Sequence, residues 1–190
     1  MAEDLDIWVA LLRGINVGGK NSLPMPTLVA LLAELGAREI KTYIQSGNAV
    51  FRCPEEDTPH LGERLSAAIN ARHGFAPQVL ILGLAAIAKA MVENPFPEAV
   101  ADPGHLHLGF LARSPEHPDL EKLERLRRES ERFCLGERVF YLYAPEGVGR
   151  SKLAANSERA LGVVMTDRNW QTVSRIMELA RVAGRSSATG

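Results

Sequence analysis

The chain has 190 residues, of which 46% are hydrophobic and 24% charged, so it is long enough for one large domain or two small ones with a sizeable core. Its 22 lysines and arginines and 23 aspartates and glutamates give a formal net charge of −1, which argues against a broadly basic nucleic-acid binder. No apolar run reaches the roughly 18 residues of a membrane helix and the acidic N-terminus does not resemble a signal peptide, so we expect a cytoplasmic protein without a membrane partner.

The first half of the chain alternates strand and helix patterns. A continuous apolar run at residues 7–12 is typical of a central strand buried on both faces, and leucines recur at helical spacing after Pro24 and after Pro59. Gly36 is a natural stop for the first helix, and Thr58 is a natural cap for the second. The expected elements are strands at 7–12, 40–44, 49–52 and 77–82, with a helix after the first strand and another after the third. This βαββαβ order is that of a ferredoxin-like unit.

The second half repeats this pattern after a break at residues 94–97 (NPFP). The expected elements are a helix at 84–92 ahead of the break, strands at 105–111, 132–135, 138–143 and 163–165, and helices at 119–130, 151–161 and 167–181. We therefore predict an α+β fold of two duplicated ferredoxin-like units, each an antiparallel sheet packed with helices, plus a C-terminal helix. The predicted boundaries are a first unit at 1–83, a connecting helix and linker at 84–104, a second unit with the C-terminal helix at 105–183 and a flexible tail at 184–190.

The most informative segment is residues 13–21 (RGINVGGKN), which places three glycines, two asparagines and two cations after the first strand. Glycine lets the backbone approach a ligand, while lysine, arginine and asparagine supply hydrogen-bond donors. In a ferredoxin-like unit this loop leaves the same edge of the sheet as the hairpin at 45–48 (QSGN), so we expect the two to be neighbours. The alternative explanation is conformational: a demanding turn with a solvated Lys20.

The glycine-rich segment also resembles part of a phosphate cradle. Residues 14–20 have the G-x-x-x-x-G-K spacing of a P-loop, but Asn21 stands where a serine or threonine would bind magnesium. The next helix begins only after Leu23 and Pro24, so Lys20 is not in its first turn. We therefore do not predict a nucleoside triphosphatase.

A second polar segment, residues 149–152 (GRSK), comes directly before a predicted helix. Ser151 is a good N-cap, while Arg150 and Lys152 place two cations at the positive end of the helix dipole. A bound anion would compensate these charges and accept hydrogen bonds from the free backbone N–H groups. The alternative is that both side chains simply point into water.

A third polar segment, residues 166–170 (TDRNW), is expected to open the last helix, with Thr166 or Asp167 as its cap. Arg168 and Asn169 would add donors in the first turn. In the duplicated fold this segment and residues 149–152 lie at one edge of the second unit, so we expect them to be close together.

Other candidate residues give weak signals. His105 and His107 share a strand face, but no third ligand is evident, so we expect no metal site and no cofactor. Cys53 and Cys134 lack ligand spacing, which predicts reduced thiols without a disulfide. No Ser-His-Asp order or carboxylate pair stands out, so the catalytic residues stay unassigned and the question of an enzymatic activity stays open.

Several linked motifs resemble those of one family. The segments at 11–25 (LLRGINVGGKNSLPM), 42–51 (TYIQSGNAVF), 94–97, 147–153 (GVGRSKL) and 166–173 (TDRNWQTV) occur in the order seen in domain-of-unknown-function family 1697. This largely bacterial family implies a duplicated ferredoxin-like fold and brings no established activity. Pro26 and Asp167 depart from its pattern, in which alanine and a second threonine are common, and Asp167 weakens an anion site beside Arg168.

We expect an uncharacterised protein that binds a small anionic ligand, bearing phosphate or carboxylate, through its polar loops. The predicted ligand-binding residues are Arg13, Asn16, Gly18, Gly19, Lys20, Asn21, Gln45, Ser46, Asn48, Arg150, Ser151, Lys152, Arg168 and Asn169. One alternative is a nucleic-acid-binding module, which requires aromatic side chains such as Tyr43 and Phe51 on an open sheet face. The other is a structural or interaction protein whose loops only shape turns or a dimer contact. The oligomeric state is not predicted.

Overall fold

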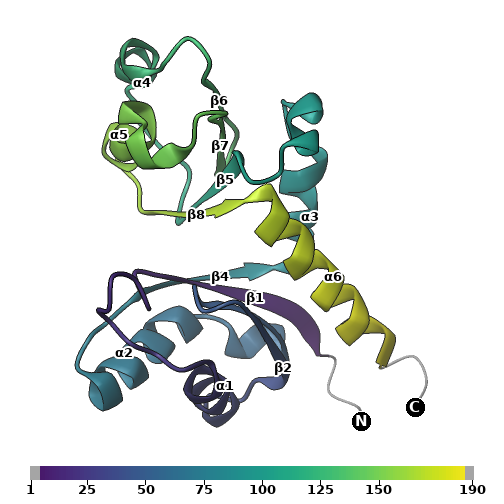
Figure 1. Ribbon diagram of the computed structural model, residues 1–190. Coiled ribbons are helices and arrows are strands. Elements are labelled where there is room, and N and C mark those ends of the chain that lie inside the picture. The colour runs from purple at the N-terminus through teal and green to yellow at the C-terminus, as the bar shows by residue number, and fades with distance from the viewer. Residues whose placement is uncertain (1–4, 187–190) are drawn as a thin grey trace. The chain divides into compact units, whose positions relative to one another are not determined.

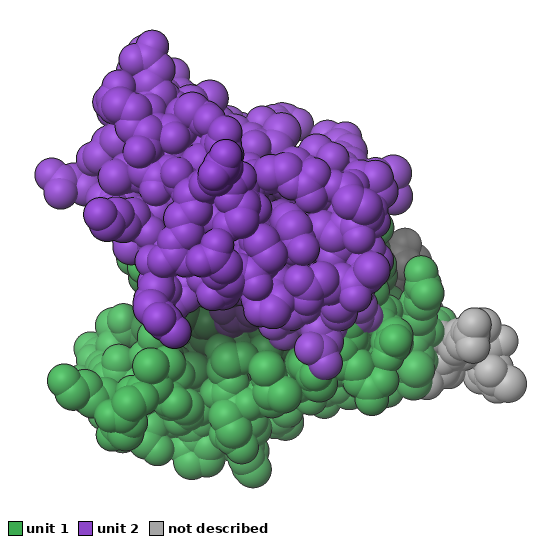
Figure 2. Space-filling model, turned by 45° about the horizontal axis from the view of Figure 1, so that its top comes forward, with its two compact units in different colours: residues 1–88, 175–190 green, residues 89–174 purple. Residues whose placement is uncertain are grey.

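The computed structural model describes residues 5–186 and confirms the predicted α+β class (Figure 1). The chain divides into two compact units, residues 1–88 with 175–190 and residues 89–174, which Figure 2 shows in green and purple. Each unit contains one four-stranded antiparallel sheet. Among the described residues, no helix combines the length and the apolar character needed to cross a membrane.

Unit 1 has the predicted βαββαβ order. Its elements are β1 (Asp6–Arg13), α1 (Met25–Glu34), β2 (Arg38–Tyr43), β3 (Asn48–Cys53), α2 (Leu61–His73) and β4 (Gln78–Gly83). The strand order is β2-β3-β1-β4, so β1 lies inside the sheet, as its continuous apolar run predicts. Helices α1 and α2 cover one face of the sheet (Figure 1). Ala10, Leu12 and Phe51 point toward them and form a core with Leu28 and Leu65.

Unit 2 repeats this topology with the strand order β6-β7-β5-β8. The second half of the chain contains α3 (Leu84–Val92), β5 (Leu106–Leu111), α4 (Leu120–Leu126), β6 (Arg132–Leu135), β7 (Val139–Tyr143), α5 (Lys152–Leu161), β8 (Met165–Asn169) and α6 (Trp170–Ser186). Its core includes Phe140, Leu142 and Leu153. Short 3-10 helices add turns at Glu55–Asp57, Pro97–Ala101 and Val148–Arg150.

The segment 166–170 differs from its prediction. Its first four residues belong to strand β8, and α6 begins only at Trp170, so neither Thr166 nor Asp167 caps a helix. The strand extends because it pairs with β5 along its whole length. Met165 lies opposite Leu111 and Asn169 lies opposite His107, a long-range pairing that the local sequence does not reveal. The first turn of α6 is capped by Asn169 instead, whose Oδ1 accepts a hydrogen bond from the Thr172 amide at 2.9 Å.

Two other helices also differ from their predicted ends. Helix α2 begins at Leu61 after His60 in a left-handed conformation, and the Thr58 hydroxyl donates to the Glu55 carbonyl instead of capping the helix. Helix α4 ends at Leu126, four residues before the predicted end. The chain turns there because the carboxylate of Glu131 accepts a hydrogen bond from the Arg128 amide at 2.8 Å.

The division into units differs from the predicted boundaries both in the middle of the chain and at the C-terminus. The boundaries fall inside α3 and inside α6, and the second part of α6 belongs to unit 1. Gly184 lies there against the Ile7 side chain of β1. The segment predicted as a tail at 184–190 is helical as far as Ser186, while residues 187–190 lie outside the described part of the chain.

Candidate functional site

In unit 1 the structure joins the two polar loops through the side chain of Asn16. Its Nδ2 donates to the Leu23 carbonyl at 2.9 Å and to the Gln45 carbonyl at 2.8 Å, and its Oδ1 accepts from the Leu23 amide at 2.8 Å. Residues 13–23 and 44–48 therefore form one continuous surface, which we call the loop edge. The expected proximity of the two loops follows from the ferredoxin-like topology and is present in the structure.

The tip of the first loop is a tight two-residue turn. Gly18 and Gly19 both have positive φ, 58° and 73°, and the Lys20 amide donates to the Val17 carbonyl at 3.0 Å. A Cβ at either glycine would meet no atom within 4 Å, so these glycines are required by the turn and not by crowding. Asn21 also has positive φ, and its Nδ2 donates to the Gly14 carbonyl at 2.8 Å.

The second loop is held from inside the unit. Gly47 has φ of 81°, and a Cβ there would lie 2.7 Å from the Cβ of Leu12, so only glycine fits. The Asn48 side chain is fully buried and donates to the Tyr43 carbonyl at 3.0 Å and to the Ser46 hydroxyl at 3.1 Å. Asn16, Asn21 and Asn48 thus use their amide groups to shape the backbone, which for the first loop agrees with the alternative of a conformationally demanding turn.

The side chains exposed on the loop edge are cationic, neutral or apolar. Arg13, Lys20 and Gln45 are exposed, and Arg13 donates a hydrogen bond to the neutral side chain of Gln78 at 3.5 Å. Neither loop contains an aspartate or glutamate. Val17 is 66% exposed and Ile44 is 51% exposed.

 Arg13 also has interactions beyond this hydrogen bond, whereas Lys20 has no ion pair among residues 5–186.

Ile44 carries backbone strain at this surface. It has φ of 48°, a left-handed conformation that is unfavourable for a β-branched residue, and its side chain is nevertheless half-exposed. The strain is maintained by the closed turn that Asn48 and Gly47 hold in place. Strained residues with exposed side chains are typical of ligand-binding or contact surfaces.

In unit 2 the predicted residues at 149–152 lie at the start of α5. Ser151 is the N-cap, as predicted: it is 2% exposed, and its Oγ accepts a hydrogen bond from the Ala154 amide at 3.0 Å. The side chains of Arg150 and Lys152 are exposed, and the Arg150 carbonyl accepts from Arg128 at 2.7 Å. Ser151 therefore has a structural role, and the two cations stay in water.

The predicted residues of β8 lie on alternating faces of the sheet. Asp167 points toward α5, so Arg168 points toward the opposite face and away from the cations at 150 and 152. Burial lowers the pKa of the Arg168 guanidinium to about 10, an effect that the neighbouring Asp167 carboxylate opposes. Asn169 is occupied as the cap of α6. Val148, which directly precedes the segment 149–152, lines a cavity together with Asp167, whereas residues 149–152 and Arg168 do not line it.

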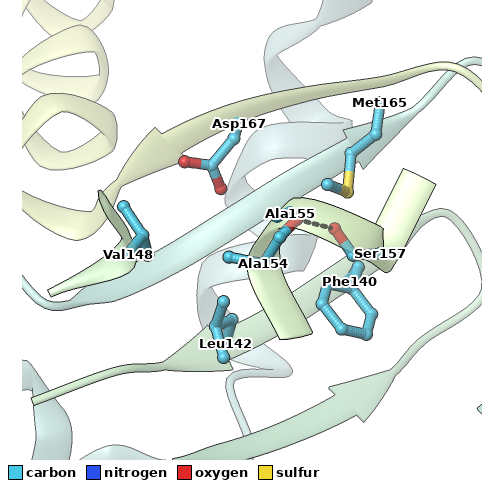
Figure 3. A pocket seen from close by; sticks show the side chains of 8 residues that line it. All are labelled: Phe140, Leu142, Val148, Ala154, Ala155, Ser157, Met165 and Asp167. Carbon is cyan, nitrogen blue, oxygen red and sulfur yellow. Dashed lines mark hydrogen bonds between the residues drawn. The ribbon is translucent and has the colours of Figure 1, made fainter. Parts of the chain in front are cut away.

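Val148 and Asp167 belong to a cavity of about 260 Å³ between α5 and the sheet of unit 2 (Figure 3). Figure 3 shows the Asp167 carboxylate pointing into this space, above the apolar side chains of Leu142 and Ala154. The cavity is lined by Phe140, Leu142, Val148, Ala154, Ala155, Ser157, Met165 and Asp167. No sequence motif marks this cavity, because its walls are mostly ordinary apolar residues.

The cavity reflects a difference in helix packing between the two units. In unit 1, α2 packs against β4, and Gly62 allows the close approach because a Cβ there would lie 2.7 Å from the Val79 carbonyl oxygen. In unit 2, α5 packs chiefly against α4. The side of β8 that faces α5 is therefore left partly uncovered, and Met165 and Asp167 are accessible from it.

Two histidines near β5 pair with different aspartates. His107 Nδ1 lies 2.7 Å from Asp167 Oδ2, and His105 Nδ1 lies 2.8 Å from Asp102 Oδ1. The histidines thus do not share a ligand, and the part of the chain that the structure describes holds no group of three or more metal-binding side chains. The pairing of His107 with Asp167 depends on the register of β5 with β8, which the sequence alone does not give.

The two cysteines are the free thiols that the sequence predicts. Cys53 and Cys134 form no disulfide, and burial raises the pKa of Cys53.

One of the aromatic residues expected on an open sheet face is buried. Phe51 lies in the core of unit 1 beneath α1 and α2. It is therefore not available for base stacking, which removes one of the two aromatic residues that the nucleic-acid alternative requires.

Comparisons with known proteins agree with this fold. The sequence model of a family described as "Protein of unknown function (DUF1697)" matches residues 5–141, which include both loops of unit 1 and exclude residues 149–152 and 166–170. A solved structure of a conserved bacterial protein from Streptococcus pneumoniae is similar with a TM-score of 0.68 and 24% identity, over 93% of this chain and 99% of that chain. No curated protein matches the chain.

Proposed function

This chain belongs to DUF1697, a protein family of unknown function, and we propose that it binds a small phosphate- or carboxylate-bearing ligand at the loop edge of unit 1. The observation that carries the proposal is the joining of two loops by Asn16 into a surface that bears cations and no acidic residue. Arg13 and Lys20 supply charge, and the amides of Gly18 and Gly19 supply neutral donors at the tip.

The proposed site is narrower than the fourteen residues expected from sequence. Asn16, Asn21 and Asn48 shape the loops, while Gln45 and Ser46 stay at its margin. Of the unit 2 residues, Ser151 and Asn169 cap helices and Arg168 lies on the face of its sheet that α5 does not cover, so we leave Arg150, Ser151, Lys152, Arg168 and Asn169 out of this site. The proposal assigns no reaction and needs no cofactor.

We also propose that the protein acts in the cytoplasm. Two free cysteines, one in each unit, suit a reducing environment such as the bacterial cytoplasm. Small phosphorylated and carboxylated metabolites are abundant there, which is consistent with a ligand of this class.

The test removes the two cations and measures ligand-induced stabilisation. Thermal unfolding is followed with inorganic phosphate, pyrophosphate and a panel of nucleotides and carboxylate metabolites. A ligand at about 100 times its Kd adds about 2.7 kcal/mol to the free energy of unfolding, which raises the Tm of a protein of this size by roughly 5–10 °C. We expect the Arg13→Ala, Lys20→Ala double variant to lose this rise.

The matched control is the Arg64→Ala, Arg72→Ala double variant, which removes the same charge from the exposed side of α2. Arg72 forms a surface ion pair with Glu34, and such pairs contribute little to stability. The control is expected to keep the full rise in Tm. An equal rise in both double variants, or no rise in the wild-type protein with any compound of the panel, contradicts the proposal.

The exposed apolar side chains favour a second candidate function, a protein contact at the same edge. Val17 and Ile44 are exposed there, and Ile44 is strained. If the edge is a contact between copies of the chain, light scattering will show a dimer that the Val17→Ser, Ile44→Asn double variant converts to a monomer. A wild-type monomer at all concentrations removes this candidate.

A further inference from the structure

We propose that the cavity between α5 and the sheet of unit 2 is a second binding site, for a small apolar molecule that carries an ammonium group. Its residues come from β7, α5, β8 and the turn at Val148–Arg150. The site is independent of the loop edge, because it lies within unit 2 and its one charged lining residue is an acid. The predicted ligand therefore has the opposite charge from that proposed for unit 1.

Only one of the two carboxylate oxygens of Asp167 has a hydrogen-bond partner among the described residues. Asp167 Oδ2 pairs with His107 Nδ1 at 2.7 Å, while Oδ1 has no hydrogen bond from any residue between 5 and 186. The His107 side chain is 10% exposed and that of Asp167 is 43% exposed, so the carboxylate is the accessible member of the pair. An ionised carboxylate only accepts hydrogen bonds, and it therefore selects a donor or a cation.

The other polar group of the lining does not compete for the ligand. The Ser157 hydroxyl donates to the Ala154 carbonyl at 2.8 Å, within α5. The remaining walls are apolar, so the body of the ligand has to be apolar as well.

The size and shape of the cavity suit a molecule built on a single ring. Its volume of about 260 Å³ exceeds the roughly 150 Å³ of an apolar cavity that holds benzene. Met165 lies across Gly109 of β5, where a Cβ would collide with the Met165 sulfur, so a flexible thioether forms part of the wall. Methionine adapts readily to the shape of a bound group.

Two cations at the start of α5 would favour a ligand of the opposite charge, so the sign of the ligand charge can be tested. Arg150 and Lys152 lie at the start of α5 with exposed side chains, where water screens them. If they governed recognition, an aromatic carboxylate would bind more tightly than an aromatic amine. If Asp167 governs it, the order is reversed.

The experiment compares three probes of similar shape: benzylamine, benzyl alcohol and phenylacetate. Binding to the full chain is measured by titration of the methyl NMR signals of Ala154 and Met165. We expect benzylamine to shift both signals with a Kd on the order of 1 mM, which is typical of so small a ligand. Benzyl alcohol is expected to bind about tenfold more weakly, and phenylacetate not to bind.

Two variants decide whether Asp167 is responsible. The Asp167→Asn variant retains an acceptor for His107 and removes the charge, so benzylamine binding should weaken at least about tenfold, to the level of benzyl alcohol. The matched control is Asp102→Asn, which changes the other His–Asp pair of unit 2 and lines no part of the cavity, and it should bind benzylamine as the wild type does.

A third variant tests the cavity itself. It keeps the proposal testable even if the Asp167→Asn variant does not fold. Ala155→Leu, at an exposed lining position of α5, fills the mouth of the cavity and should abolish binding of all probes while circular dichroism stays unchanged. The proposal is overturned if phenylacetate binds as tightly as benzylamine. It is also overturned if Ala155→Leu leaves the benzylamine titration unaltered, or if no probe shifts the two methyl signals.

Discussion

Asn16 shows how a single polar residue can look like a ligand-binding group in the sequence and act as a structural one in the fold. It holds φ of 53° and bonds the backbone of two loops that are far apart in sequence. Leu23, whose amide and carbonyl it satisfies, is fully buried, so water cannot replace these bonds. The side chain therefore contributes to stability, and through it to the position of Arg13 and Lys20.

We predict that Asn16→Ala lowers the free energy of unfolding by about 4–5 kcal/mol. The variant loses three hydrogen bonds, each contributing about 1 kcal/mol, and places alanine in a left-handed conformation. Urea unfolding followed by Trp8 fluorescence in a Trp170→Phe background measures the loss. Asn21→Ala is the matched control, because Asn21 has the same φ of 53° and one such bond, and it should cost about half as much. Equal losses in the two variants would show that the backbone conformation alone matters.

At the scale of elements, the closeness of α2 to β4 distinguishes unit 1 from unit 2. Gly62 faces the Val79 carbonyl in unit 1, whereas α5 of unit 2 leaves space beside β8. Two copies of one topology thus differ in how the second helix covers the edge strand. This difference leaves the cavity in unit 2, and in unit 1 Gly62 permits the close approach of α2 to β4.

We predict that Gly62→Ala destabilises the protein, against the normal rule for a helix. Alanine in a helix is favoured over glycine by about 1 kcal/mol, but its Cβ would lie 2.7 Å from a backbone oxygen that cannot move aside. We expect a net loss of about 1–3 kcal/mol in the free energy of unfolding, measured by urea unfolding. In the control, Gly184→Ala of α6, the new Cβ lies 3.5 Å from Ile7 Cδ1, so that variant should be stabilised by up to about 1 kcal/mol. A gain in both variants would contradict the prediction.

At the scale of the whole molecule, the two units share helices. The boundary at residues 88 and 89 falls inside α3, and that at 174 and 175 falls inside α6. Each of these helices therefore has one part in each unit. When one unit unfolds, the part of the helix in the other unit loses its continuation. Helix α3 has nine residues and is too short to remain stable by itself.

We predict that the chain unfolds in one cooperative transition. Its two tryptophans allow the test, because Trp8 lies in unit 1 and Trp170 in unit 2. In the Trp8→Phe and Trp170→Phe variants, the remaining tryptophan reports on one unit, and its urea midpoint should coincide with that of far-ultraviolet circular dichroism in the same variant. A separate fluorescence transition in either variant would show that the units unfold independently.

The order of the elements could be predicted from sequence because hydrophobic periodicity is a local property. The apolar run of β1, the leucine faces of α1 and α2 and the cap at Ser151 are all read within one or two turns of chain. The closeness of the loops followed once the topology was known. The strand at 165–169 was wrongly predicted, because its backbone partner in β5 lies about 58 residues away.

The amino-acid sequence by itself determined the βαββαβ order, its duplication and the polar loops at one edge of the first sheet, because periodicity, caps and turn residues act over short stretches of chain. Only the tertiary structure decided that the asparagines shape these loops, that His107 pairs with Asp167, and that a cavity lies beneath α5. These features depend on strand register and on how closely helices approach a sheet, which are set by contacts between residues far apart in sequence.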